Sequence, residues 1–184
     1  MSPWHLRQAA HTICAGGVIA YPTETVYGLG CDPMNQMAVE RLLALKNRPA
    51  DKGLIIIASD IDQLTPYIRI DSQALKSKIT QIYSRPTTWV CPPNPNIPPW
   101  LTGQHNAIAI RITQHPASRR ICELSQRAIV STSANPSGLT PAHNALKARQ
   151  YFSHKIDYLL HDHLNIKARP SRIINLIDAR IIRP

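Results

Sequence analysis

The stretch Tyr21-Pro-Thr-Glu-Thr-Val-Tyr-Gly-Leu-Gly-Cys-Asp32 decides how the fold of this chain is interpreted. It follows the short apolar run Gly17-Val-Ile-Ala20, which is typical of a buried strand. A strand that leads into threonines, a carboxylate and glycines brings hydroxyls and bare backbone N–H groups to its carboxyl end. In open α/β sheets, small ligands bind at that end. A tight turn between a strand and a helix is the alternative interpretation of the same residues.

A second stretch, Lys46-Asn-Arg-Pro-Ala-Asp-Lys-Gly-Leu54, places three cations within seven residues, at the end of a predicted helix. A solvated helix C-terminus accounts for them, because cations there interact favourably with the helix dipole. A phosphate clamp accounts for them as well, because Arg binds phosphate in a bidentate way and Lys supplies a point charge. The flanking Pro49 and Gly53 shape the backbone around the cations, and this favours a fixed ligand.

A third stretch, Ser131-Thr-Ser-Ala-Asn-Pro-Ser-Gly138, directly follows the strand-like run Ala128-Ile-Val130. An ordinary polar loop is one interpretation. Loops this rich in hydroxyl and amide groups at a strand end commonly carry function, since a rigid scaffold positions them.

The order of predicted elements indicates one α/β domain over residues 1–184. Strand-like runs lie at 17–21, 54–59, 87–91, 107–112, 128–131, 156–160, 172–177 and 180–183, and helical patterns at 36–46, 73–83, 116–126 and 143–152. Ser2 and Pro3 begin a first helix, and Gly16 follows its last turn. Alternation of strands and helices predicts a twisted, open, mixed sheet with flanking helices. The last strands lack long helices between them, so part of the sheet should be antiparallel.

Composition restricts the class of protein further. The chain has 184 residues and a net charge of +10, which favours a polyanionic partner such as nucleic acid, or an anionic substrate. No run approaches the ~20 apolar residues that span a bilayer, and the N-terminus lacks the pattern of a signal peptide. Four widely spaced cysteines indicate free thiols in a reducing cytoplasm.

Several common catalytic patterns are absent from the sequence. There is no Gly-x-Ser-x-Gly elbow, no Walker motif and no His-Glu-x-x-His metal site. The pair His161 and His163 is more typical of a solvated surface than of a metal site, so no metal site is predicted. Arg111 lies in the alternating strand 107–112, where it must reach an anion or the sheet edge, because burying an unpaired charge is costly. An outward-facing surface Arg is the alternative.

Taken together, the three polar stretches resemble the TsaC/YrdC family, the threonylcarbamoyl-AMP synthases. The family patterns Y-P-T-[ED]-T-x-[YF]-G-[LV]-G, K-x-R-P-x-x-[KN]-[PG]-L and S-x-S-A-N-x-S-G all occur, in the family order, over nearly the whole chain. The chain is similar to the short bacterial type. It departs from the family at Ser84-Arg-Pro-Thr-Thr-Trp89, which lacks about three residues of a W-P-G-P-[VL]-T loop beside the ligand cleft. Sequence leaves open whether this shortened loop, at Arg85–Thr88, affects activity.

The resemblance implies an enzyme that joins L-threonine, bicarbonate or CO2, and ATP. Its products are L-threonylcarbamoyladenylate and pyrophosphate, and the adenylate serves the t6A37 modification of tRNAs that read ANN codons. The implied fold is a mixed open sheet with a concave binding face. ATP is a substrate, Mg²⁺ is expected with it, and tRNA and the other t6A-pathway proteins are the expected partners.

The resemblance also implies roles for individual residues, and no covalent nucleophile is among them. Lys46 and Arg48 would position and stabilise charge. The residues implied on the ATP side are Lys46, Arg48, Lys52, Ser133, Asn135, Pro141 and Arg183. The residues implied on the threonine side are Thr25, Arg111, Ser131 and Ser171, and Thr23 and Thr88 would line the cleft.

A different class of protein fits the basic charge and the shortened loop as well, namely a non-catalytic module that binds tRNA or double-stranded RNA. Such a module binds RNA in a strongly salt-dependent way and turns over no nucleotide.

Overall fold

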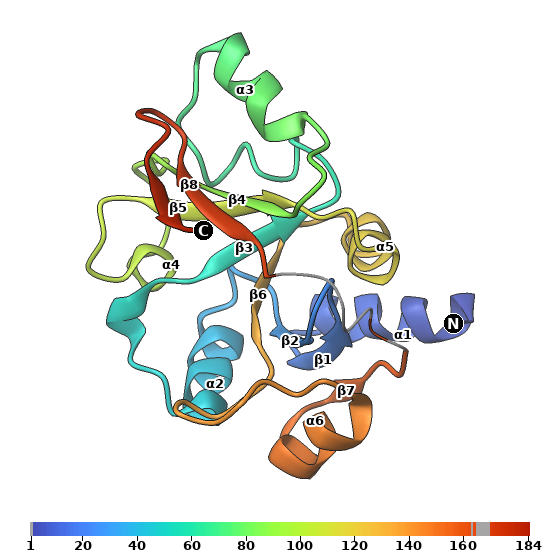
Figure 1. Cartoon of the computed structure of the whole chain (residues 1–184). Helices are drawn as coiled ribbons and strands as arrows, with labels where there is room; N and C mark the ends of the chain where they lie inside the picture. Colours follow the sequence, from blue (N-terminus) through green and yellow to red (C-terminus); the bar gives the residue numbers. More distant parts are fainter. Residues whose placement is uncertain (1, 163, 165–169) are drawn as a thin grey trace.

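The computed structural model describes residues 2–162, 164 and 170–184 (Figure 1). Its strands are β1 Ile19–Pro22, β2 Tyr27–Gly30, β3 Ile55–Ala58, β4 Thr87–Cys91, β5 Ile108–Ile112, β6 Ile129–Ser133, β7 Tyr158–Leu159, β8 Arg172–Asn175 and β9 Ile181–Arg183. Its α-helices are α1 Pro3–Cys14, α2 Gln36–Lys46, α3 Gln73–Thr80, α4 Pro99–Thr102, α5 Pro116–Ser125 and α6 Ala145–Phe152. Two short 3₁₀ helices, η1 Ala50–Lys52 and η2 Ser153–Lys155, complete the elements.

The strands form one mixed sheet in the order β7-β1-β2-β6-β3-β5-β4-β8-β9. Within the described residues, the pairs β1/β7, β3/β5 and β4/β8 are parallel, and the other neighbours are antiparallel. The predicted α/β fold with a partly antiparallel sheet is therefore confirmed.

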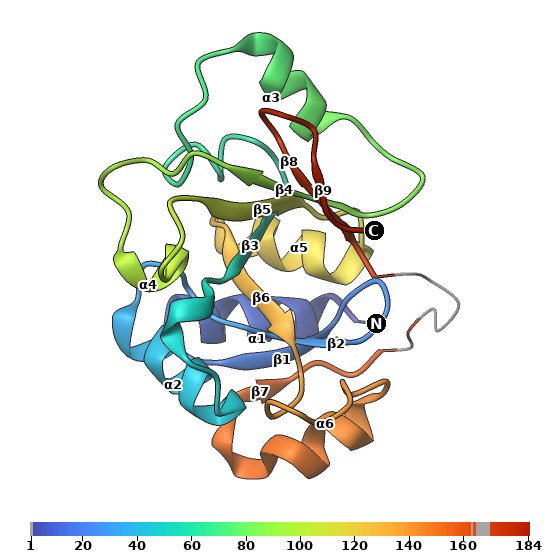
Figure 2. The ribbon, with the colours of Figure 1, turned by 60° about the vertical axis from the view of Figure 1, so that its left-hand side comes forward.

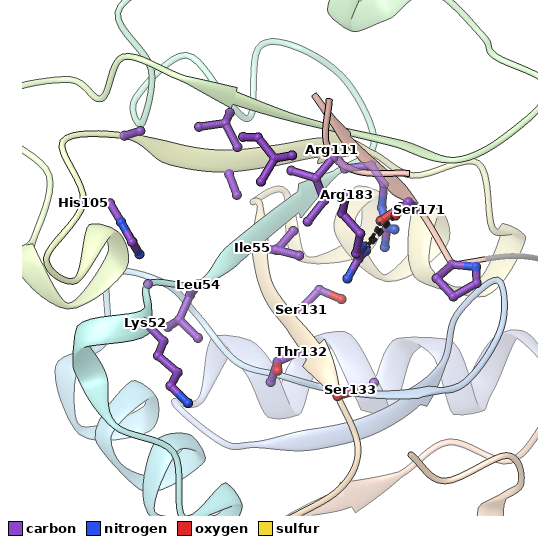
Figure 3. A pocket seen from close by; sticks show the side chains of 18 of the residues that line it. Lys52, Leu54, Ile55, His105, Arg111, Ser131, Thr132, Ser133, Ser171 and Arg183 are labelled. Carbon is purple, nitrogen blue, oxygen red and sulfur yellow. Dashed lines mark hydrogen bonds between the residues drawn. The ribbon is translucent and has the colours of Figure 1, made fainter. Parts of the chain in front are cut away.

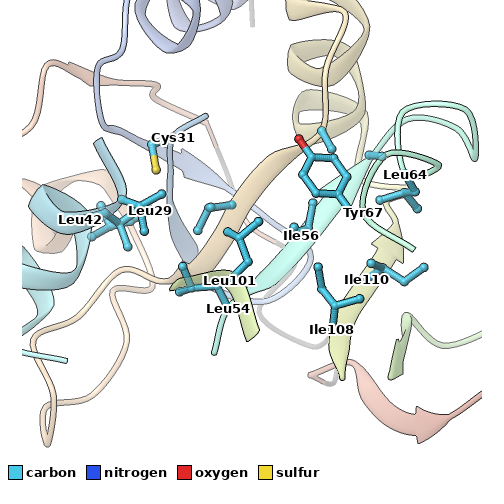
Figure 4. Packing of buried hydrophobic residues seen from close by; sticks show 14 of the residues in the cluster. Leu29, Cys31, Leu42, Leu54, Ile56, Leu64, Tyr67, Leu101, Ile108 and Ile110 are labelled. Carbon is cyan, nitrogen blue, oxygen red and sulfur yellow. The ribbon is translucent and has the colours of Figure 1, made fainter. Parts of the chain in front are cut away.

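Helices cover the sheet on both faces. The pair α1 and α5 lies on one face, while α2 and α4 lie on the other (Figures 1 and 2). The run Ile55-Ile-Ile-Ala58 of β3 explains why both faces are apolar. Ile56 packs into the larger core, which Leu42 of α2 and Leu101 of α4 share (Figure 4). Its neighbour Ile57 packs against α1 and α5, because successive strand side chains point to opposite faces.

The helix ends follow the expected chemistry. Pro3 and Pro116 occupy the first turns of α1 and α5, where a missing N–H costs nothing. The Asn35 side chain accepts a hydrogen bond from the Ala38 N–H at 3.0 Å and caps α2. Helix α2 ends at Lys46, and its C-cap Asn47 adopts the left-handed conformation with φ 49°.

The main difference from the prediction concerns the stretch from Tyr21 to Asp32. Residues 21–32 do not lead from a strand into a helix, because β2 returns antiparallel beside β1. Thr23 closes the turn, since its N–H and its hydroxyl both donate to the Val26 carbonyl, at 3.1 and 2.7 Å. Neither β2 nor the single turn α4 was predicted. The other predicted elements are confirmed, and their ends shift by a few residues at most.

Candidate functional site

A cleft of about 1030 Å³ lies on the sheet and is lined by residues from β3, β5, β6, the β1–β2 turn and the β8–β9 hairpin. Figure 3 shows its two ends. Lys52 and His105 lie at one end, and Arg111, Arg183 and Ser171 at the other. The polar residues Ser131, Thr132 and Ser133 of β6 run between the two ends.

The first end of the cleft is cationic. Arg48 and Lys52 both line it, as the resemblance implies. Nη2 of Arg48 donates to the Gly53 carbonyl at 3.0 Å, while its Nε is buried without a partner. Burial lowers the pKa of Arg48 from its usual range, yet the group remains cationic at every physiological pH. An arginine with an unused, buried donor at a cleft is suited to receive an anion.

Two glycines hold this end in place. Gly53, with φ 59°, and Gly103, with φ 61°, bring two backbone segments into contact. A Cβ at Gly103 would lie 2.2 Å from the Asp51 carbonyl oxygen, which excludes every other residue without backbone movement.

Lys46 is the cation that the structure places elsewhere. It is only 3% exposed and does not line the cleft. Its Nζ donates to the carbonyl oxygens of Ser133 and Asn135, and to Oδ1 of Asn135 at 3.4 Å. Burial, together with a smaller effect from the charge of Arg48, lowers the pKa of Lys46 to about 8.

The end of β6 brings Ser133 to the cleft and the following loop brings Pro141, but Asn135 does not line it. The Asn135 side chain is used within the loop. Its Oδ1 accepts from the Ser133 hydroxyl at 2.6 Å, and its Nδ2 donates to the Leu139 carbonyl at 2.7 Å. Asn135 therefore shapes the loop.

The second end of the cleft is built around an ion pair. Nη2 of Arg111 lies 3.4 Å from Oε2 of Glu24, and both side chains are largely buried. The Thr113 hydroxyl donates to Oε1 of Glu24 at 3.2 Å. Burial disfavours the charged carboxylate, but the Arg111 guanidinium and the hydrogen bonds outweigh it and hold the pKa of Glu24 below its usual value. Nε of Arg111 has no partner, so the guanidinium keeps donor capacity for a ligand.

The β8–β9 hairpin closes this end. Nη2 of Arg183 donates to the Ser171 carbonyl at 2.7 Å and to its hydroxyl at 3.1 Å. Burial, and then the nearby charges of Arg111 and Arg85, lower the pKa of Arg183. Thr88 is fully buried behind the wall and donates to Oγ of Ser171 at 3.0 Å. Thr88 therefore orients Ser171 and does not itself reach the cleft.

The shortened loop keeps the sheet intact. Arg85 donates twice to the Pro170 carbonyl, at 3.0 and 2.9 Å, and the Pro86 carbonyl accepts from the Arg172 N–H at 3.0 Å. β4 and β8 then pair in parallel from Thr87 onward. The loop borders a smaller cavity of about 220 Å³, which shares Glu24 with the main cleft.

Most of the residues singled out from the sequence meet in this one cleft. Those that line it are Thr23, Thr25, Arg48, Lys52, Arg111, Ser131, Ser133, Pro141, Ser171 and Arg183. Lys46, Thr88 and Asn135 do not line it. Residues that the sequence analysis did not single out also line it, namely Glu24, Gln104, His105, Asn106, Thr132, Asn175 and Arg180. Glu24 stands within the opening motif, where a lone carboxylate among hydroxyls was a usable signal, whereas 104–106 follow no pattern.

Metal-ligating residues do not gather in the part of the chain that the structure describes. No group of three or more His, Cys, Asp or Glu side chains there is placed to hold a metal ion. Nε2 of His161 accepts a hydrogen bond from Nη2 of Arg149 at 3.0 Å, and the second histidine of the pair, His163, lies outside the described residues. Among the described helices, none is long and apolar enough to cross a membrane.

Comparison with known proteins agrees with this geometry. The Sua5/YciO/YrdC family model, described as telomere recombination, matches residues 11–184. A threonylcarbamoyl-AMP synthase of Pseudomonas entomophila is 43% identical over 184 residues, which is the whole of this chain and 99% of that protein. One of Pseudomonas putida is 44% identical over the same coverage.

Solved structures show the same fold. The P. abyssi Sua5 complexed with L-threonine superposes with a TM-score of 0.91 at 31% identity, covering this whole chain and 55% of that longer one. E. coli YciO shares the fold, with a TM-score of 0.80 at 23% identity, over 97% of this chain and 87% of that one. With matching motifs, a matching fold and full-length relatives, the chain belongs to the Sua5/YciO/YrdC family.

Proposed function

We propose that this chain synthesises L-threonylcarbamoyladenylate from L-threonine, bicarbonate or CO2, and ATP, and releases pyrophosphate. The full-length relatives at 41–44% identity that carry the name threonylcarbamoyl-AMP synthase support this proposal. The L-threonine complex of P. abyssi Sua5 supports the choice of amino acid.

One observation about the cleft carries the proposal from the structure itself. Cationic groups occupy both ends, Arg48 and Lys52 at one and Arg111 at the other, and the hydroxyls of β6 lie between them. A nucleotide triphosphate and an amino-acid carboxylate are the two anions of this reaction. A cleft with two separate anion-binding ends fits a reaction that joins them.

At the threonine end, Arg111 binds the carboxylate, and the hydroxyls of Thr25, Ser131 and Ser171 surround the amino acid. Glu24 adds a role that the sequence analysis did not assign. It is the carboxylate among the described lining residues, and it lies beside Arg111. Because an α-amino acid carries its ammonium two bonds from its carboxylate carbon, a paired Arg and Glu match both charges. Thr23 shapes the turn that presents Glu24.

At the nucleotide end, Arg48 and Lys52 bind the phosphates, and Ser133 and Pro141 bind the adenylate side. Arg183, which the resemblance implies on the ATP side, contacts the nucleotide from the other end of the cleft, where it is bonded to Ser171. Asn135 and Lys46 support the loop that presents Ser133. Thr88 supports Ser171 from behind. These three residues thus act on the site through the groups that they hold.

The chemistry fits residues that position and neutralise charge. The threonine amine adds to CO2 and loses a proton, which gives a carbamate. A carbamate oxygen then attacks the α-phosphorus of ATP, the bond to the β-phosphate oxygen breaks, and pyrophosphate leaves. Such a transfer requires alignment and stabilisation of developing charge. Arg48 and Lys52 supply positive charge for the pyrophosphate, and no covalent nucleophile of the protein is needed.

Mg²⁺ enters the proposal as part of the ATP substrate. The described lining of the cleft does not fit a resident metal site, because Glu24 is the one carboxylate in it and no group of three metal-ligating side chains is formed there. Mg²⁺ is commonly held by substrate phosphates and water with few protein ligands. The phosphates of ATP are therefore the expected ligands.

The product places the reaction before the t6A37 modification of tRNAs that read ANN codons, in the cytoplasm. The net charge of +10 supports contact with tRNA, and the other proteins of that modification are the further proposed partners. The alternative of a non-catalytic RNA-binding module is not favoured, since the full-length relatives are named as synthases.

The deciding experiment is the release of pyrophosphate from ATP by the purified chain. Release should require threonine and bicarbonate together, and omission of either should abolish it. Salt-dependent binding of tRNA without any nucleotide turnover would instead restore the RNA-binding alternative.

A further inference from the structure

Lys46 is hydrogen-bonded to residues 133–137 through both its side chain and its backbone carbonyl. Its Nζ donates to the carbonyl oxygens of Ser133 and Asn135, and its own carbonyl oxygen accepts from the Ser137 N–H at 2.6 Å. Residues 131–142 contain no titratable side chain. These residues therefore offer the ammonium only neutral oxygens. Lys46 donates to the Asn135 carbonyl, and it shares the Ser133 carbonyl with the Asn135 N–H.

The same helix end also positions the other wall of the nucleotide end. Two residues after Lys46, the Arg48 N–H donates to the Leu43 carbonyl at 3.0 Å. Its guanidinium donates to the carbonyls of Gly53 at 3.0 Å and Lys52 at 3.4 Å. The C-terminus of α2 thus fixes Ser133 through Lys46, and the η1 segment through Arg48.

We propose that Lys46 is a positioning residue, which sets the distance between the Ser133 loop and the Arg48–Lys52 segment and so shapes the nucleotide site without touching the phosphates. This inference rests on the proposed function. It differs from a direct phosphate contact, because every hydrogen bond of the Lys46 ammonium is already made inside the protein.

A direct phosphate contact and a positioning role predict different changes in the affinities for ATP and AMP, which differ in the length of the phosphate chain. A residue that contacts the β- or γ-phosphate favours the binding of ATP over that of AMP, so its removal weakens the binding of ATP selectively. A residue that shapes the loop changes the binding of both nucleotides together. The ratio of the AMP and ATP dissociation constants therefore separates the two roles, and a general loss of stability does not move this ratio.

The experiment compares Lys46→Met with Lys52→Met by calorimetry with ATP and with AMP. Lys46→Met should weaken the binding of both nucleotides at least tenfold. It should leave the ratio of the AMP and ATP dissociation constants within about twofold of that of the unmodified protein. Lys52→Met, whose side chain lines the cleft, should weaken ATP several times more than AMP. Lys78→Met, in the last turn of α3, is the matched surface control and should change neither.

A measurement on the unmodified protein covers the case in which Lys46→Met does not fold. The affinities for ATP and AMP should decline in parallel as the pH rises through about 8, where Lys46 loses its proton. Arg48 is the charged group whose field reaches Lys46, and it stays charged over this range.

Two outcomes would overturn the inference. A selective loss of ATP binding in Lys46→Met, as large as in Lys52→Met, would mean that the ammonium reaches the phosphates. Unchanged binding of both nucleotides would reduce Lys46 to support of the fold. If the unmodified protein binds neither nucleotide, the proposed function itself fails.

Discussion

Replacement of Arg111 by Met removes the guanidinium and keeps most of the apolar stem. Arg111 is 8% exposed, its Nη2 faces Glu24 at 3.4 Å, and its Nε is buried without a partner. If the free donors bind the substrate carboxylate, the variant loses a charged hydrogen bond, worth about 1.5–3 kcal/mol. Each 1.4 kcal/mol of binding free energy changes a dissociation constant about tenfold. The dissociation constant for threonine should therefore rise by about 10- to 150-fold.

Stability should change as well, for a separate reason. Without Arg111, Glu24 is a buried carboxylate with only the Thr113 hydroxyl as a side-chain partner. Breaking such a pair by removing one partner is destabilising, whereas replacing both partners with neutral groups is often close to neutral. The double variant Arg111→Met with Glu24→Gln should therefore recover much of the melting temperature, while threonine affinity stays low.

Calorimetric titration with threonine and thermal melting measure the two effects independently. Arg120→Ala, on the exposed face of α5, is the matched control and should leave both unchanged. Threonine affinity within twofold of the unmodified protein, in an Arg111→Met variant that melts normally, would refute the reasoning and return Arg111 to a structural role.

Three further predictions concern other parts of the cleft. Because the pKa of Glu24 is lowered in the folded protein, its contribution to stability should be present above the ordinary glutamate pKa of 4.5 and be lost as the pH falls through its folded pKa. The melting temperatures of the unmodified protein and Glu24→Gln should thus differ at pH 7 and converge in acid; a gap independent of pH would contradict this. Gly103→Ala should cost more than about 1–2 kcal/mol in denaturant unfolding and weaken ATP binding, because its Cβ meets the Asp51 carbonyl at 2.2 Å; a stability within 0.5 kcal/mol of the original would show that the backbone adjusts. In the pyrophosphate assay serine should be used less well than threonine and valine hardly at all, since valine leaves the site's hydroxyls unpaired; equal turnover of valine would remove the threonine assignment.

The sequence alone determined the class of fold and the three polar stretches of the cleft. Apolar runs at 54–59 and 107–112 are separated by helical patterns and by breaks at Gly and Pro. Such patterns depend only on residues close together in the sequence, so the secondary structure that they predict is formed in the folded protein. The helix over 36–46 was predicted with its observed ends, and in the structure Asn35 and Asn47 cap it. The motifs likewise lie in short continuous segments, so their residue types could be read directly.

The tertiary structure decided which of these side chains face the cleft. Lys46 and Lys52 are similar in the sequence, yet one ammonium is buried against carbonyls and the other lines the cleft. Glu24 and Arg111 become partners only because β1 and β2 form a hairpin that brings its turn to the end of β5. Local patterns fix the conformation of a segment, but the direction and partners of a charge depend on packing between segments far apart in the chain, where burial makes an unpaired charge too costly to keep.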